Sequence, residues 1–103
     1  MLKSTEILQI GTNTILMESA SLQKLSTLLN ENFSKAVEDI LKIKGRVVIT
    51  GIGKSAIIAQ KIVATFNSTG TPALYMHAAD AIHGDLGMIQ QDDLVICISK
   101  SGN

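Results

Sequence analysis

The spacing of apolar residues changes near residue 45, and this change divides the chain in two. In the first part, apolar side chains recur every seven residues, at Leu8, Ile15, Leu22 and Leu29. This spacing predicts one long helix or two short ones over residues 4–29, although Gly11 weakens the first turns. The apolar stripe either packs on its own domain or meets a second copy of the chain, and the pattern leaves both open.

A second helix is expected over residues 33–44, with an apolar face formed by Phe33, Val37, Ile40 and Leu41. Asn30 or Asn32 can cap it, because a side-chain amide oxygen accepts hydrogen bonds from free N–H groups of the first turn. Residues 1–45 are therefore expected to be a helical lead-in to residues 46–103.

The second part alternates short apolar runs with a helical stretch. Residues 47–49 and 94–98 are apolar throughout, which is typical of parallel strands buried on both faces, and residues 73–76 form a third short run. The intervening helix, from about residue 55 to 67, is expected to bury the face formed by Ile58, Ile62 and Phe66 together with Ala59 and Val63. The alternation predicts an α/β fold, a three-layer parallel sheet with strand order 2-1-3 and helices on both faces.

The remaining connections are shorter. Residues 77–81 are expected to be a loop or a short helix, and residues 91–93 a turn.

The turn at residues 51–55, Gly-Ile-Gly-Lys-Ser, has the composition of an anion site. A nucleotide phosphate loop is excluded, because its first glycine would fall at Val48. A dinucleotide fingerprint fits Gly51, Gly53 and Ala56. However, His77 stands where that fold has an acidic residue. A sugar-phosphate site and a plain structural turn with an exposed lysine remain.

A second polar loop, at residues 99–102, favours the sugar-phosphate interpretation. In the order 2-1-3 it lies beside the turn at 51–55, at the switch point where parallel sheets bind ligands. Serine hydroxyls and backbone N–H groups suit a phosphate. The charge of Lys54 can hold an oxyanion or stabilise an enediolate.

Both histidines, His77 and His83, follow the second strand. A histidine there can transfer protons near neutral pH or serve as a hydrogen-bonded structural residue, with equal weight. Asp80 and Asp85 add acidic neighbours, but the spacing matches no compact metal motif. No metal and no cofactor is therefore expected.

Composition excludes several function classes. The net charge is zero and no segment is strongly basic, so no nucleic-acid partner is expected. No apolar run approaches the ~18–20 residues of a membrane span, and the start lacks the pattern of a signal peptide. Cys97 is the only cysteine and is expected to pack in the core of a cytoplasmic protein.

These motifs together resemble the sugar isomerase (SIS) domain, and most closely the arabinose-5-phosphate isomerase family. Four segments carry the resemblance, in the family's order: residues 50–55, 65–72, 83–88 and 99–102. The resemblance implies interconversion of D-ribulose 5-phosphate and D-arabinose 5-phosphate through an enediol, a step that feeds lipopolysaccharide synthesis. It also implies a flavodoxin-like fold, of which residues 46–103 would be the first half, truncated at Asn103.

The resemblance further implies roles for individual residues. The phosphate would be held by Ser55, Ser99, Ser101 and Gly102, and the catalytic residues would include Lys54 and His83. The family's carboxylates and a further histidine lie beyond residue 103, so the chain offers no general base. Lys100 departs from the family pattern, since close relatives often have asparagine there. A homo-oligomer, either dimer or tetramer, is the expected assembly.

The alternative is a non-catalytic SIS module that binds a sugar phosphate within a regulator. Such a regulator needs a DNA-binding or partner segment, and residues 1–45 are neither basic nor spaced as a helix-turn-helix. The enzyme is therefore the preferred interpretation.

Overall fold

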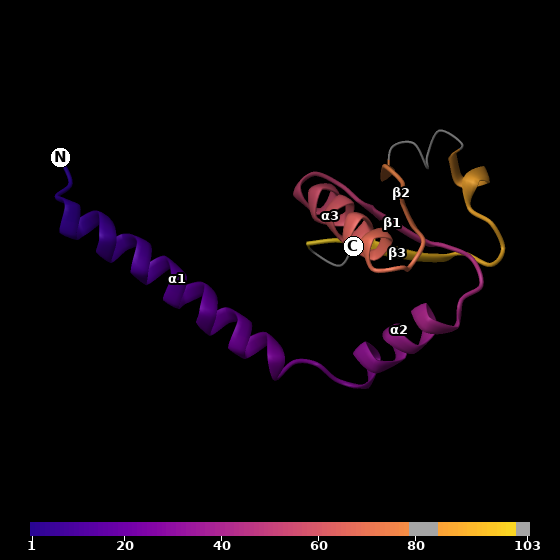
Figure 1. Ribbon diagram of the computed structural model, residues 1–103, viewed down its shortest axis with the longest axis horizontal. Helices are drawn as coiled ribbons and strands as arrows, with labels where there is room; N and C mark the ends of the chain where they lie inside the picture. The colour runs from indigo at the N-terminus through magenta and orange to yellow at the C-terminus, as the bar shows by residue number, and fades with distance from the viewer. Residues whose placement is uncertain (79–84, 101–103) are drawn as a thin grey trace. The chain divides into compact units, whose positions relative to one another are not determined.

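A computed structural model describes residues 1–78 and 85–100 of the chain. In chain order the elements in Figure 1 are α1 (Ser4–Ser26), α2 (Glu31–Lys42), β1 (Val47–Gly51), α3 (Lys54–Ser68), β2 (Ala73–Tyr75), the 3₁₀ helix η1 (Asp85–Met88) and β3 (Leu94–Ile98). The chain divides into two compact units, Met1–Ala36 and Val37–Asn103.

The first apolar stripe forms one helix, α1, which ends at Ser26 rather than at residue 29. The Ser26 and Thr27 hydroxyls donate to the carbonyls of Gln23 and Lys24, at 2.6 and 2.7 Å, and so satisfy acceptors of the last turn. No residue of α1 is buried. Across residues 1–78 and 85–100, no helix is both long and apolar enough to cross a membrane.

Helix α2 begins at Glu31 and ends at Lys42, two residues earlier at each end than the pattern predicts. Its cap is Asn30, whose Oδ1 accepts a hydrogen bond from the backbone N–H of Asn32 at 2.9 Å. Farther along, Ile40 and Ile43 pack against the apolar core around β1.

The three strands form a parallel sheet in the order β2-β1-β3, which confirms the predicted order. The central strand is fully buried at Val47, Val48 and Ile49. β2 ends at Tyr75, one residue early, but Met76 N still donates to Ile49 O at 3.0 Å. β-branched side chains suit this position, and each such burial stabilises the fold by about 1.5–3 kcal/mol.

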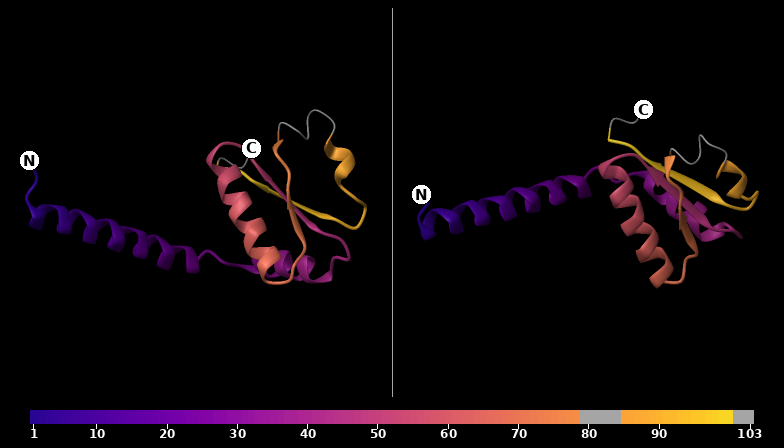
Figure 2. Two further views of the ribbon diagram at one scale, coloured as in Figure 1. Left: turned by 45° about the horizontal axis from the view of Figure 1, so that its top comes forward. Right: turned by 90° about the horizontal axis from the view of Figure 1, so that it is seen from above.

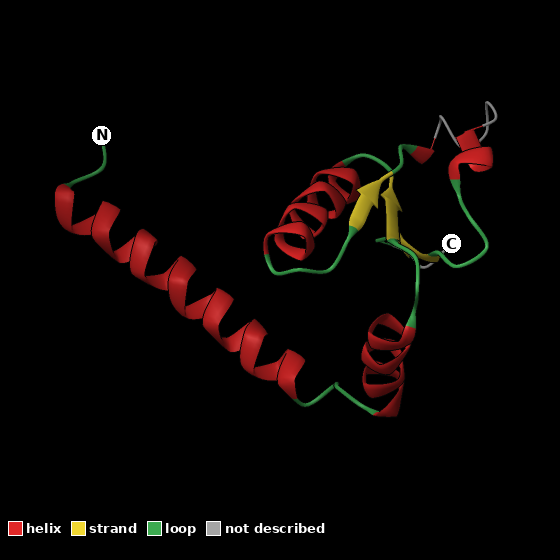
Figure 3. Ribbon diagram, turned by 45° about the vertical axis from the view of Figure 1, so that its right-hand side comes forward, coloured by secondary structure: helices red, strands yellow, loops and turns green. Residues whose placement is uncertain are grey.

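Helix α3 lies along the strands (Figure 3). Ala59 is fully buried against Val47 and Ile49, and the cluster is completed by side chains that include Ile62, Val63 and Phe66. The prediction that Ile58 belongs to this face is wrong, because 54% of its surface is exposed. Ala59 and Val63, which were predicted on the same face, do pack against the core.

A buried carboxylate joins the starts of β1 and β3. Asp93 accepts hydrogen bonds from Arg46 N at 2.8 Å, Arg46 Nη2 at 3.0 Å and Gln90 N at 2.8 Å, and its side chain is only 1% exposed. The hydrogen bond from the Arg46 side chain is the main cause that lowers the Asp93 pKa from 3.8 to about 2. Beside it, Leu94 N donates to Arg46 O at 2.9 Å and begins the β1–β3 ladder.

We expect Asp93→Asn to lower the melting temperature at pH 7 and to flatten its dependence on acid. The pKa of Asp93 in the folded state lies below its unfolded value. The stability that the ionised carboxylate adds to the fold is therefore complete above about pH 4 and is lost as the pH falls toward about 2. Circular dichroism melting curves at pH 7, 4, 3 and 2 measure this. Asp92→Asn, at the exposed neighbouring position, is the control. If the melting temperature of Asp93→Asn fell with pH as steeply as that of the wild type, the assignment would be contradicted.

Candidate functional site

A cavity of about 270 Å³ lies where β1 and β3 end. Three segments line it: the end of β1 and the start of α3 (Thr50, Ile52 and Ser55), the segment after β2 (Ala78), and the end of β3 with the residues after it (Cys97, Ile98, Ser99 and Lys100). The β1–β3 register pairs Gly51 with Ile98, so the two strands end side by side. This is the switch-point position that the sequence predicts.

The turn between β1 and α3 is tight, so the first turn of α3 lies close to the end of β1. A Cβ added at Gly51 would lie 2.9 Å from the carbonyl carbon and oxygen of Ser55, closer than side chains pack, and Gly53 has a φ of 63°. Ser55 N also donates to Ile52 O at 3.2 Å. Figure 2 shows the end of β3 beside this turn.

The structure brings together two of the predicted phosphate ligands, because Ser55 and Ser99 both line the cavity. Lys54 is the first residue of α3 and is exposed, one position before Ser55, but it is not among the lining residues. Three predicted site residues, His83, Ser101 and Gly102, lie outside the described residues.

Cys97 and Thr50 are among the lining residues that the sequence did not assign to the site. Cys97 was expected in the core but is exposed, because Leu94, Ile96 and Ile98 take the better-covered face of β3 while Val95 and Cys97 take the other. Thr50 is the second, and its signal in the sequence is a polar residue near the end of an otherwise apolar strand.

The local charge favours an anion. Lys100 lines the cavity, and Lys54 stands beside the lining residue Ser55. α3 has neither an acidic residue in its first turn nor a side-chain cap on its first residues, so its N-terminus keeps its partial positive charge. His77 is exposed at the end of β2, where its ring meets Tyr75 edge-on with centroids 6.4 Å apart.

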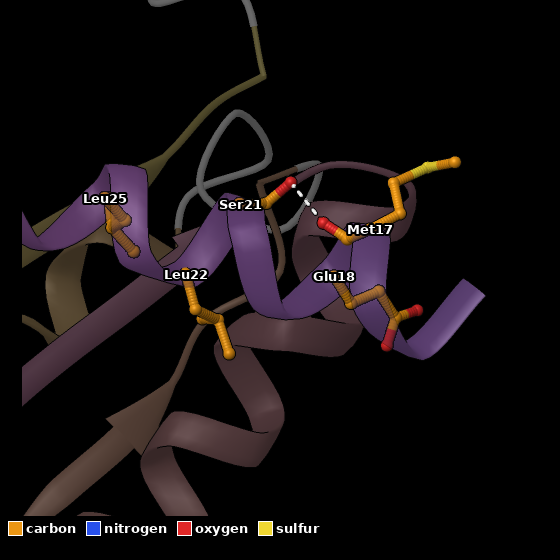
Figure 4. Close-up of a pocket in the computed structure, with 5 residues that line it drawn as sticks. All are labelled: Met17, Glu18, Ser21, Leu22 and Leu25. Carbon is orange, nitrogen blue, oxygen red and sulfur yellow. Dashed lines mark hydrogen bonds between the residues drawn. The ribbon is translucent and has the colours of Figure 1, made fainter. Parts of the chain in front are cut away.

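A second hollow, of about 560 Å³, lies along α1 alone (Figure 4) and is lined by Met17, Glu18, Ser21, Leu22 and Leu25. The Ser21 hydroxyl donates to Met17 O at 3.1 Å, within the helix. Small-molecule sites need several polar groups that converge on the ligand, and this helix face is mainly apolar. The cavity at the ends of β1 and β3 is therefore the candidate site.

Comparison with known proteins adds independent information. Residues 40–103 match the family described as SIS domain. The chain is 49% identical over 94 residues to the arabinose 5-phosphate isomerase KdsD of Yersinia pestis, with 91% of this chain and 29% of that protein covered. It is 46% identical over 99 residues to the arabinose 5-phosphate isomerase GutQ of Escherichia coli K12, covering 96% and 31%.

Among solved structures, the c3406 protein of Escherichia coli CFT073, in complex with arabinose 5-phosphate, superposes with a TM-score of 0.88. Sequence identity is 37%, over 95% of this chain and 52% of that one. The chain thus spans under a third of the two curated relatives and about half of the solved structure.

Gly51→Ala is expected to destabilise the fold by roughly 1–3 kcal/mol, because the new methyl group would overlap backbone atoms of Ser55 and push α3 away from β1. Urea unfolding followed by circular dichroism measures the change. Gly87→Ala is the matched control, since nothing lies within 4 Å of its Cβ position. Equal free energies of unfolding for the two variants would show that a methyl group fits at position 51 without displacing α3.

Proposed function

The chain belongs to the SIS domain family, and we propose that it is part of an aldose–ketose isomerase that interconverts D-arabinose 5-phosphate and D-ribulose 5-phosphate. One observation carries the proposal: the β1–β3 register brings Ser55 and Ser99 to a single cavity beside two lysines. The names of the Yersinia and Escherichia relatives and the arabinose 5-phosphate in the c3406 structure agree with this substrate class.

In the proposed complex the phosphate lies at the rim of the cavity. The hydroxyls of Ser55 and Ser99 donate to its oxygens, and Ser101 and Gly102 continue the same loop. Lys100 and the N-terminus of α3 add positive charge. Several donors and a nearby cation suit a phosphate dianion better than a neutral ligand.

The chemistry we propose is a proton transfer. A base removes the proton at C2 of the aldose, an enediolate forms, and a proton returns at C1 to give the ketose. Lys54 stabilises the developing negative charge, since its ammonium group lies at the start of α3 and is free to move in solvent. His83 transfers protons between substrate oxygens. In the reverse direction the same steps form arabinose 5-phosphate, which we propose supplies lipopolysaccharide synthesis.

The assembly we propose is a homo-oligomer in the cytoplasm. Leu8, Ile15 and Leu22 are each about two-thirds exposed along α1, and a heptad stripe of this kind suits helix–helix contact with another copy. A single cysteine is typical of cytoplasmic proteins.

In the full-length isomerase, Lys54→Met is expected to lower the turnover number by about 100-fold, because the enediolate loses its compensating charge. An assay of ribulose 5-phosphate formation from arabinose 5-phosphate measures it. Lys61→Met, an exposed lysine on the same helix, is the matched control. An unchanged rate for Lys54→Met would remove Lys54 from the mechanism. A wild-type protein without turnover that binds a different sugar phosphate tightly would favour the regulatory module.

We expect the 103-residue chain alone to show no isomerase activity, because it spans under a third of its curated relatives and the family resemblance assigns no general base within it. The same assay at high protein concentration tests this. Turnover above that of a buffer blank would mean that the base lies within residues 1–103.

A further inference from the structure

One hydroxyl at the candidate site lacks a hydrogen bond. Thr50 is 9% exposed, and its Oγ1 is buried with no partner among the described residues. Buried side-chain hydroxyls are nearly always paired, and an unpaired one lowers the stability of the fold. Thr50 also lines the cavity. A hydroxyl that has no partner in the described part of the chain, on a residue that borders a cavity, is a candidate contact for a ligand in that cavity.

The strand geometry determines which way Thr50 faces. Val47 and Ile49 face the core cluster with α3, so alternation turns Thr50 to the opposite side of β1. Thr50 pairs with Cys97 in the parallel ladder, and paired residues share a side of the sheet. Cys97 is exposed and lines the same cavity, so Thr50 borders the cavity on the side of the sheet that faces away from α3, although its oxygen is itself buried.

We propose that Thr50 is a specificity residue that hydrogen-bonds a hydroxyl group of the bound sugar. The inference rests on the proposed function, because it assumes a sugar phosphate in this cavity. The surroundings of Thr50 favour a neutral partner: Val48, two residues earlier on the same face of β1, is fully buried, and an apolar environment disfavours a charged phosphate. The cationic side chain that lines the cavity, Lys100, follows the end of β3 and suits the phosphate.

Two substitutions separate this role from a structural one. Thr50→Val keeps the branched shape and removes the hydroxyl, and since that hydroxyl has no partner among the described residues, the melting temperature is expected to stay equal or rise. Thr50→Ser keeps the hydroxyl and is the matched control.

Cys97 supplies the readout, because it is the only cysteine, is exposed and lines the cavity. A ligand in the cavity is expected to slow alkylation of this thiol by iodoacetamide. The experiment measures the alkylation rate of the 103-residue chain and of both variants against increasing arabinose 5-phosphate and, separately, inorganic phosphate.

For Thr50→Val, half-protection is expected to need about 3- to 10-fold more arabinose 5-phosphate, the loss of one neutral hydrogen bond. Protection by inorganic phosphate stays unchanged, and Thr50→Ser behaves like the wild type.

Three results would overturn the assignment while leaving the site in place. They are equal protection of wild type and Thr50→Val by the sugar phosphate, equal weakening for both ligands, or a lower melting temperature confined to Thr50→Val. A wild-type chain that neither ligand protects would remove the proposed site, and Thr50 with it. The separate isomerase assay reports on the reaction itself.

Discussion

The site depends on a carboxylate at the opposite end of the sheet. Asp93 holds the backbone and the guanidinium of Arg46 and the backbone of Gln90, and so fixes where β3 begins relative to β1. Side chains alternate between the two faces of a strand, so a slip of one residue would turn Ile96 and Ile98 away from the core. The register that this carboxylate maintains therefore decides which residues meet where the strands end.

The candidate site arises from the meeting of two loops, neither of which is a site by itself. Ser55 follows a turn in which Gly51 lets the helix backbone approach the strand, and Ser99 directly follows the last paired residue of β3. A bulkier residue at position 51 or a shifted register would separate the two hydroxyls. Positive charge from Lys100 and from the N-terminus of α3 adds a local potential that favours an anion at this cavity.

The sequence was sufficient to predict the strands, their order and the convergence of residues 51–55 with the loop after β3, because apolar runs and glycines act locally. It could not predict which face of β3 is covered, and so the exposure of Cys97 was missed. That exposure depends on packing between distant segments. The sequence also could not predict that the Thr50 hydroxyl has no partner among the described residues, because this depends on the position of every nearby hydrogen-bonding group. The predicted place of Lys54 at the turn is correct, but whether it borders the cavity depends on the rotation of the first helical turn.

The end of β1 carries two local constraints. Val47, Val48 and Ile49 are fully buried and stabilise the fold, whereas the next residues carry an unpaired hydroxyl at Thr50 and a positive φ at Gly53. The buried hydroxyl lowers stability unless a partner offsets it, and the backbone at Gly53 restricts that position to glycine. These constraints fall where the cavity is, and this supports a function for that end of the sheet.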